Sequence, residues 1–226
     1  MSPTGQQPAR AAEHVALLGD SIFDNAAYVP RGRDVVSHLR SLLPAEWRAT
    51  LYAVDGATTS ALQTQVARVP QDVTQIIVSI GGNDALQNID LLSMRVTSSA
   101  AALEAFGTRL GTFERNYRDA IDAVLALGPP VTICTIYNGA LEPDQADIAR
   151  VALTLFNDVV LRTAFDNGLD VIELRTVCCE RADYANPIEP SDAGGRKIAE
   201  AIAATLGLLP KHAWSRVWAL TPNMGR

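Results

Sequence analysis

A serine that directly follows a short apolar segment is the first residue of this sequence that could do chemistry. Residues 15–19, V-A-L-L-G, are followed by Asp20 and Ser21. An apolar run that ends on glycine is typical of a buried strand in a parallel sheet, and open α/β folds build their sites at the carboxyl ends of such strands. Ser21 would there be placed as a nucleophile. A turn or a helix cap would also explain an aspartate and a serine at this position.

Two further loops carry groups that acyl transfer requires. D-G-A at 55–57 follows an expected second strand, and G-G-N-D at 81–84 follows a strand indicated by the β-branched residues of 75–80. An attacked carbonyl group needs a nucleophile and several N–H donors that face the developing oxyanion. A glycine N–H and an asparagine side-chain amide supply these donors without bulk. Because loops that follow parallel strands lie along one sheet edge, the three loops can converge on one point.

Strands that alternate with helices along the chain must position these loops. The expected strands span residues 15–19, 47–54, 75–80, 131–137 and 169–174. The expected long helices span residues 34–43, 98–127, 143–167 and 192–206. This alternation predicts a parallel sheet with helices on both faces.

The composition limits the class of protein and its partners. The 226 residues suit one domain at 13–209, with a disordered lead-in at 1–12 and a tail at 210–226 packed on the domain. The net charge is −6 and no basic cluster is present, so nucleic acid is not an expected partner. No apolar stretch reaches the length of about 18 residues that a membrane span requires. The absence of a signal-peptide pattern and of a disulfide framework predicts a cytoplasmic protein; the oligomeric state is left open.

Taken together, the three loops resemble the motifs of the GDSL, or SGNH, hydrolase family. In that family a Gly-Asp-Ser block supplies the nucleophile, and a glycine and the asparagine of a Gly-x-Asn-Asp block complete the oxyanion hole. The matching residues are Ser21, Gly56 and Asn83, and the resemblance covers residues 15–206. It implies a flavodoxin-like three-layer α/β/α sandwich with a five-stranded parallel sheet. It also implies a serine esterase for a small acyl ester, a chemistry that needs no metal or other cofactor.

The fourth sequence block of the family departs from the pattern. The family carries Asp-x-x-His-Pro before the last helix, where the histidine is the base and the aspartate orients it. Here the stretch reads N-P-I-E-P, so Asn186 stands at the position of the aspartate and Glu189 at that of the histidine. The other histidines are His14, His38 and His212. Only His212, in the tail, is expected to be able to reach the site.

This substitution leaves two functions open. In the first, Glu189 is the general base of the esterase and Asn186 positions it. Neighbouring prolines and an isoleucine would raise the pKa of Glu189 by removing water, whereas the following helix N-terminus would lower it. A carboxylate base is expected to keep substantial activity at about pH 5 to 6. In the second function, turnover is lost, Glu189 only stabilises the N-terminus of the last helix, and the pocket binds an acylated or glycosylated small molecule.

Other residues have simpler interpretations. A flavin- or nucleotide-binding protein is disfavoured because no loop has the glycine pattern that cradles phosphate. Cys178 and Cys179 are expected to be packed thiols rather than a metal or redox pair. Asp20 and Asp84 are expected to hold their loops through backbone hydrogen bonds. The aromatic tail is expected to be a strap on the domain, with a lid or a dimer contact as the alternative.

Overall fold

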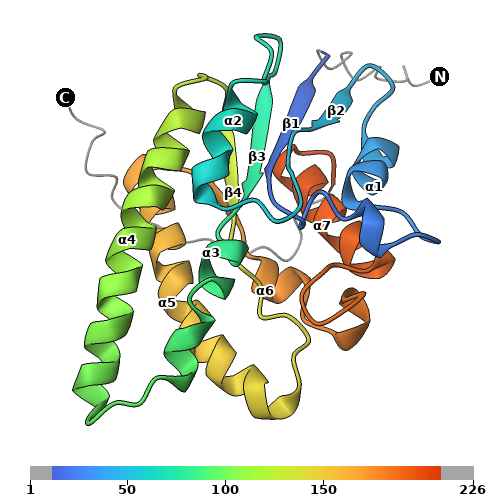
Figure 1. The fold of residues 1–226 in the computed structure, drawn as a ribbon. Coiled ribbons are helices and arrows are strands. Elements are labelled where there is room, and N and C mark those ends of the chain that lie inside the picture. The colour runs from blue at the N-terminus through green and yellow to red at the C-terminus, as the bar shows by residue number, and fades with distance from the viewer. Residues whose placement is uncertain (1–11, 210–226) are drawn as a thin grey trace, which may run out of the picture.

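Five short segments form the sheet of this protein, which is described here over residues 12–209 by a computed structural model (Figure 1). The strands are β1 (His14–Gly19), β2 (Arg48–Leu51), β3 (Gln75–Ser79), β4 (Val131–Cys134) and β5 (Asp170–Ile172). Their order is β2-β1-β3-β4-β5, and every neighbouring pair is parallel. This confirms the predicted five-stranded parallel sheet. The predicted tail with His212, and residues 1–11 of the predicted lead-in, lie outside the described residues.

Side chains that alternate along β1 divide the core into two layers. Ala16 and Leu18 pack with α2 (Leu62–Val66), α4 (Ser99–Leu125) and α5 (Pro143–Asn167). Val15 and Leu17 pack with α1 (Val35–Leu42) and α7 (Asp192–Thr205). Figure 1 shows these two groups of helices on opposite faces of the sheet. The sheet is therefore covered on both faces, which explains why the central strand β1 is buried along its whole length without a polar alternation.

The predicted long helices are all present, and local signals set their ends. Asp34 caps α1 by accepting a hydrogen bond from the Ser37 N–H, and Ser191 caps α7 by accepting one from the Gly194 N–H. Helix α5 has the predicted bounds, and Gly168 ends it with a φ of 65°. No helix in the described part of the chain is long and apolar enough to cross a membrane.

Several short elements beyond the strand ends are not predicted from the sequence. These are α3 (Gly82–Leu86), α6 (Leu174–Val177) and the 3₁₀ segments η1 (Ala26–Tyr28), η2 (Thr59–Ala61), η3 (Ile89–Ser93) and η4 (Arg181–Asp183). Elements of three to five residues are too short for a hydrophobic period to reveal them. In Figure 1, α3 lies below the carboxyl end of the sheet, between α4 and α6.

Two buried side-chain amides fix the backbone at strand ends. Gln65 accepts a 2.7 Å hydrogen bond from the Gly19 N–H and donates one of 2.7 Å to the Gly19 carbonyl. Asn157 makes the same two-sided contact with Ile136, just after β4. Gly19 has a φ of 131°, and a Cβ there would lie 1.8 Å from the Ser79 carbonyl oxygen, so the position requires glycine. The residues that follow β1 therefore leave the sheet in a defined direction.

Candidate active site

The side chains of Ser21 and Glu189 meet at the carboxyl end of the sheet although 168 positions separate them in the sequence. Ser21 Oγ donates a hydrogen bond of 3.0 Å to Glu189 Oε1. Ser21 is 8% exposed and Glu189 is 5% exposed. Ser21 sits in a tight turn, in which the Phe23 and Asp24 N–H groups both bond to the Asp20 carbonyl. The geometry is that of a hydroxyl nucleophile beside a candidate proton acceptor.

Asn186 shapes the loop that carries Glu189. Its Oδ1 accepts hydrogen bonds of 2.9 Å from the N–H groups of both Ile188 and Glu189. An asparagine that bonds its own backbone in this way stabilises a turn. Asn186 therefore contacts Glu189 through the backbone, and no hydrogen bond joins its amide to the Glu189 carboxylate within the described structure.

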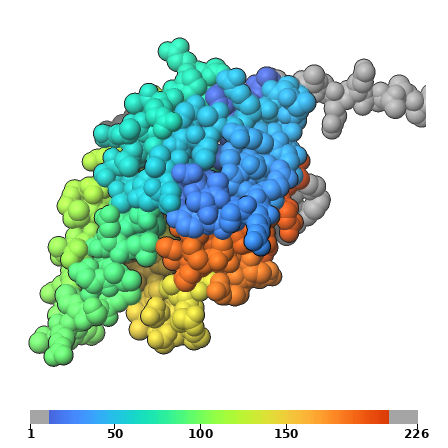
Figure 2. All heavy atoms as spheres, turned by 45° about the vertical axis from the view of Figure 1, so that its right-hand side comes forward, coloured from blue at the N-terminus to red at the C-terminus, as the bar shows by residue number. Residues whose placement is uncertain are grey.

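Contacts from distant segments hold the same loop. The Tyr137 hydroxyl donates to the Ile188 carbonyl at 2.5 Å. Asn25, which is fully buried, donates to the Pro190 carbonyl at 3.2 Å and accepts from the Val35 N–H at 3.0 Å. Figure 2 shows the blue segment that follows β1 against the orange segment near the end of the described chain. Glu189 is thus held on both flanks by residues far away in the sequence.

Glu189 does not cap the last helix. Ser191 performs that role, and the Glu189 carboxylate bonds to Ser21 instead. The interpretation of Glu189 as an ordinary helix-terminal carboxylate is therefore wrong. The reason is local geometry, because the cap belongs to the residue that directly precedes the first helical turn.

Burial makes the Glu189 carboxylate unusually basic. Its pKa is raised to about 7, chiefly because the site removes water from the charged form, while the hydrogen bond from Ser21 lowers the pKa and the charge of Asp55 raises it. Glu189 Oε2 is buried and has no hydrogen-bond partner among residues 12–209. As the pH falls, a carboxylate with this pKa becomes neutral over the same pH range in which a histidine becomes charged. The expectation of substantial activity at about pH 5 to 6 is therefore not supported.

Asp20 is a second buried carboxyl group at this site. Burial raises its pKa to about 8, a hydrogen bond from the Ile22 N–H opposes the shift, and the charges of Glu189 and Asp84 add to it. The bond from Ile22 measures 3.1 Å and holds the turn, as predicted. Because the pKa lies above 7, Asp20 is mostly neutral at neutral pH and adds little negative charge beside Glu189.

Of the two predicted oxyanion residues, Asn83 lies in the pocket wall and Gly56 lies outside it. Asn83 Nδ2 donates to the Ala57 carbonyl at 2.9 Å, which ties α3 to the loop after β2. Asp84 strengthens the same link by accepting from the Thr59 N–H and hydroxyl, in line with its predicted structural role. Gly56 is exposed and does not line the pocket, so its part in an oxyanion hole stays a prediction.

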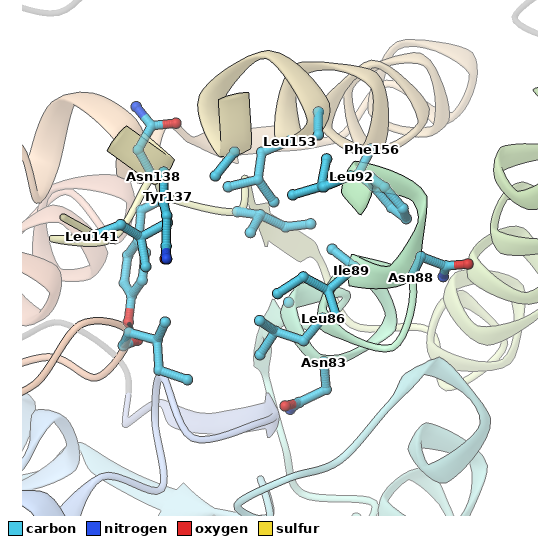
Figure 3. Close-up of a pocket in the computed structure, with 18 of the residues that line it drawn as sticks. Asn83, Leu86, Asn88, Ile89, Leu92, Tyr137, Asn138, Leu141, Leu153 and Phe156 are labelled. Atoms are coloured by element: carbon cyan, nitrogen blue, oxygen red, sulfur yellow. Dashed lines mark hydrogen bonds between the residues drawn. The ribbon is translucent and has the colours of Figure 1, made fainter. Parts of the chain in front are cut away.

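An apolar pocket of about 570 Å³ opens from Ser21 and Glu189. Asn83, Leu86 and Ile89 line one side, and Leu153 and Phe156 line another (Figure 3). The volume falls within the range of about 300–1,000 Å³ that is usual for small-molecule sites. The pocket joins a possible nucleophile to a large hydrophobic surface.

Neither histidine in the described part of the chain contacts Ser21. His14, at the opposite end of β1, contacts the Thr50 hydroxyl at 2.8 Å. His38 contacts Asp192 Oδ1 at 2.8 Å, at the N-terminus of α7. His212 lies outside the described residues.

The three cysteines do not form a metal or redox site in the described structure. All are free thiols; Cys134 and Cys178 are buried and Cys179 is exposed. The prediction of two packed thiols at 178 and 179 is therefore wrong for Cys179, because the chain turns outward after α6. Residues 12–209 contain no cluster of histidine, cysteine, aspartate and glutamate that could hold a metal ion.

A comparison with family profiles identifies one family. The profile of the GDSL-like Lipase/Acylhydrolase family matches residues 17–197. No functionally curated protein has significant sequence similarity to the chain.

Solved structures share the fold at low sequence identity. The extracellular lipase from Streptomyces rimosus is 15% identical with a TM-score of 0.64, and the match covers 85% of this chain and 99% of that chain. A member of the lipolytic G-D-S-L family from Veillonella parvula DSM 2008 is 18% identical with a TM-score of 0.65, over 88% of this chain and 100% of that chain. The acetylxylan esterase from Geobacillus stearothermophilus is 19% identical with a TM-score of 0.64, over 88% and 97% of the two chains.

Proposed function

The chain belongs to the GDSL-like lipase/acylhydrolase family, and we propose that it hydrolyses an acyl ester with Ser21 as the nucleophile and Glu189 as the general base. The observation that carries this proposal is the buried 3.0 Å hydrogen bond from Ser21 Oγ to Glu189 Oε1. A general base must lie within hydrogen-bond reach of the proton it removes and should have a pKa near the working pH. Glu189, with a pKa of about 7, meets both conditions.

In the first half of the reaction, Ser21 Oγ attacks the acyl carbon while its proton passes to Glu189 Oε1. The carbonyl electrons move to oxygen, and the Ser21 and Gly56 N–H groups and the Asn83 amide stabilise the oxyanion. When the tetrahedral intermediate collapses, the bond to the alcohol oxygen breaks. Glu189 returns its proton to that oxygen, so the alcohol leaves neutral and an acyl-enzyme remains.

In the second half, water repeats the attack on the acyl-enzyme. Glu189 accepts a proton from the water, the Ser21 Oγ to acyl-carbon bond breaks, and the proton passes to Ser21 Oγ. The carboxylic acid leaves, and the hydrogen bond between Ser21 and Glu189 forms again. Asn186 takes no part in proton transfer here; it acts as a positioning residue through the backbone of the Glu189 loop.

Labelling with a fluorophosphonate probe tests the proposal. The probe reacts with an activated serine, and intact mass measures the extent of labelling. We expect labelling of the native protein and none for Ser21→Ala. Glu189→Gln should label at least about 10²-fold more slowly, because the amide cannot take the serine proton.

Glu104→Gln is the matched control, since Glu104 is exposed on α4 and does not line the pocket. It should label at the native rate. Native labelling of Glu189→Gln would contradict the role of this carboxylate as base. A native protein that is not labelled at any pH would contradict the esterase and favour a protein that only binds its ligand.

A further inference from the structure

The pocket beside Ser21 is far larger than a short acyl group requires. Its volume is about 570 Å³, whereas one water molecule, which is close in size to a methylene group, takes up about 30 Å³ of liquid. An acetyl group would leave most of this apolar space filled with water. Because apolar surface is stabilised when water is removed from it, a hydrocarbon chain is the ligand that fits this space best.

The carboxyl groups of the pocket lie at its ends. Asp20 and Glu189 are at the inner end, beside Ser21, and Asp90 and Asp144 are exposed at the rim. Asp90 forms an ion pair of 3.0 Å with Arg109, which offsets its negative charge. Between the two ends the lining is mostly apolar and carries no charged group, although it includes the side-chain amides of Asn83, Asn88 and Gln145.

Several of the apolar side chains that line the pocket are exposed to solvent. Ile89 on η3 is 63% exposed and Ile148 on α5 is 55% exposed, although both line the pocket. Leu86 and Leu92 on the α3–η3 side are also exposed. A chain that lay between the two walls would cover all four side chains at once, which is a second indication of an apolar ligand.

The chemistry of the site decides which part of an ester enters the pocket. Glu189 must protonate the leaving alcohol, so the alcohol lies on the Glu189 side of Ser21, near the exposed Ile188. The pocket runs from Tyr137, Ile188 and Glu189, all of which line it, to Phe156 in the core layer under α4 and α5. With the alcohol on the Glu189 side, the acyl group, which stays bound to Ser21 after the alcohol leaves, is directed toward the Phe156 end of the pocket.

We propose that the substrate is an ester of a linear fatty acid with about eight or more carbons, and that its acyl chain lies between the α3–η3 segment and α5. The ester chemistry in this statement rests on the proposed function. The acyl-chain site itself rests on the size and lining of the pocket. The small acyl ester that the motifs suggest would be a poor substrate by comparison.

Ile148 and Val151 provide a matched pair of test positions. Both are exposed and apolar on α5, at 55% and 62%, but only Ile148 lines the pocket. For the native protein, kcat/KM on monomeric p-nitrophenyl esters from acetate to laurate should rise up to about fourfold per methylene, which corresponds to about 0.8 kcal/mol per buried CH₂. Ile148→Lys should lower the laurate-to-acetate ratio about tenfold or more, and Val151→Lys should leave it unchanged.

A binding measurement separates this inference from the proposed function. Laurate should bind to Ser21→Ala, as measured by calorimetry, and Ile148→Lys but not Val151→Lys should weaken this binding in the same background. Such binding without hydrolysis by the native protein would overturn the esterase but keep the acyl-chain site. Ser21-dependent hydrolysis that is flat or falls with acyl length, or that rises only with the length of the alcohol, would overturn the acyl-chain site but keep the esterase.

Discussion

Asp183 and Glu189 are two buried carboxylates on the chain segment before α7, but their surroundings differ. Asp183 is 1% exposed, lies 2.7 Å from Lys197 Nζ, and accepts a hydrogen bond from the Glu180 N–H. Glu189 is 5% exposed, and its carboxylate accepts a hydrogen bond from the Ser21 hydroxyl. One carboxylate is neutralised by a cation and the other is not.

This difference separates a structural group from a reactive one. A buried charge that is paired can stay ionised, whereas one without a cation takes up a proton more readily. Burial of the charged Glu189 carboxylate therefore lowers the stability of the folded protein. A carboxylate held in this way is a better proton acceptor, so the unfavourable burial and the proposed catalytic role have the same origin.

The largest expected effect comes from removing the cation beside Asp183. Lys197→Met should destabilise the fold by about 3 kcal/mol or more, because it leaves a buried carboxylate unpaired. Urea unfolding at neutral pH measures this change. Arg196→Met is the control, since its exposed pair with Glu200 should contribute less than about 1 kcal/mol. An equal effect of the two substitutions would show that the Asp183 pair has no special structural role.

The next effect concerns the pH dependence of turnover. Because Glu189 must be ionised to act as a base and has a pKa of about 7, kcat/KM should fall about tenfold for each pH unit below that value. At about pH 5 the activity should be about 10²-fold below its plateau. A pH profile of ester hydrolysis measures this directly. A plateau that continued to about pH 5 would show that Glu189 keeps an ordinary pKa in solution.

A smaller effect is expected in the stability of Glu189→Gln. The pKa of this group rises from an ordinary 4.5 to about 7 on folding, so the folded protein binds its proton more tightly than the unfolded chain does. The contribution of Glu189 to the stability of the folded state is therefore complete below pH 4.5, and it is lost as the pH rises through about 7.

Since glutamine carries no charge, the variant should be more stable than the native protein by about 1 to 3 kcal/mol at about pH 8. The two proteins should have similar stability at about pH 4. Thermal unfolding at both pH values makes the comparison. A variant that is less stable than the native protein at the higher pH would contradict the unfavourable burial of this carboxylate.

The smallest effect concerns the turn that presents Glu189. Asn186→Ala removes the acceptor of two backbone N–H groups and should destabilise the protein by about 1 kcal/mol, with a several-fold loss of kcat/KM. Asn186→Asp keeps an acceptor oxygen and should restore the stability. Its added negative charge should also move the activity profile to higher pH by raising the pKa of Glu189. An unchanged profile in that variant would place residue 186 too far from the carboxylate to affect it.

Much of the fold could be predicted because its signals are local. Asp34, Ser191 and Gly168 mark helix ends through contacts within one turn, and the apolar runs of β1 and β3 indicate strands buried on both faces. The α3–η3 segment could not be predicted in this way. It is short, and its conformation depends on contacts such as the bond from Asn83 to Ala57.

The same distinction between local signals and long-range contacts applies to the candidate site. The resemblance of the motif blocks to one family was enough to pair Ser21 with Glu189, and the structure brings these two side chains into contact. The role of Asn186 was less visible, since a residue that bonds only to backbone looks the same in sequence as one that orients a side chain. The acyl-chain pocket was not visible at all, because its walls come from segments that are separated by about a quarter of the chain.

The sequence by itself determined which chemical groups the protein carries and which strands and helices deliver them, because these depend on residue type and on neighbours along the chain. Only the tertiary structure decided how reactive those groups are and what can reach them. The pKa of Glu189 depends on how completely the folded chain removes water from its carboxylate, and the pocket depends on the gap between η3 and α5. Burial is a property of the packed molecule, so no local pattern could report it.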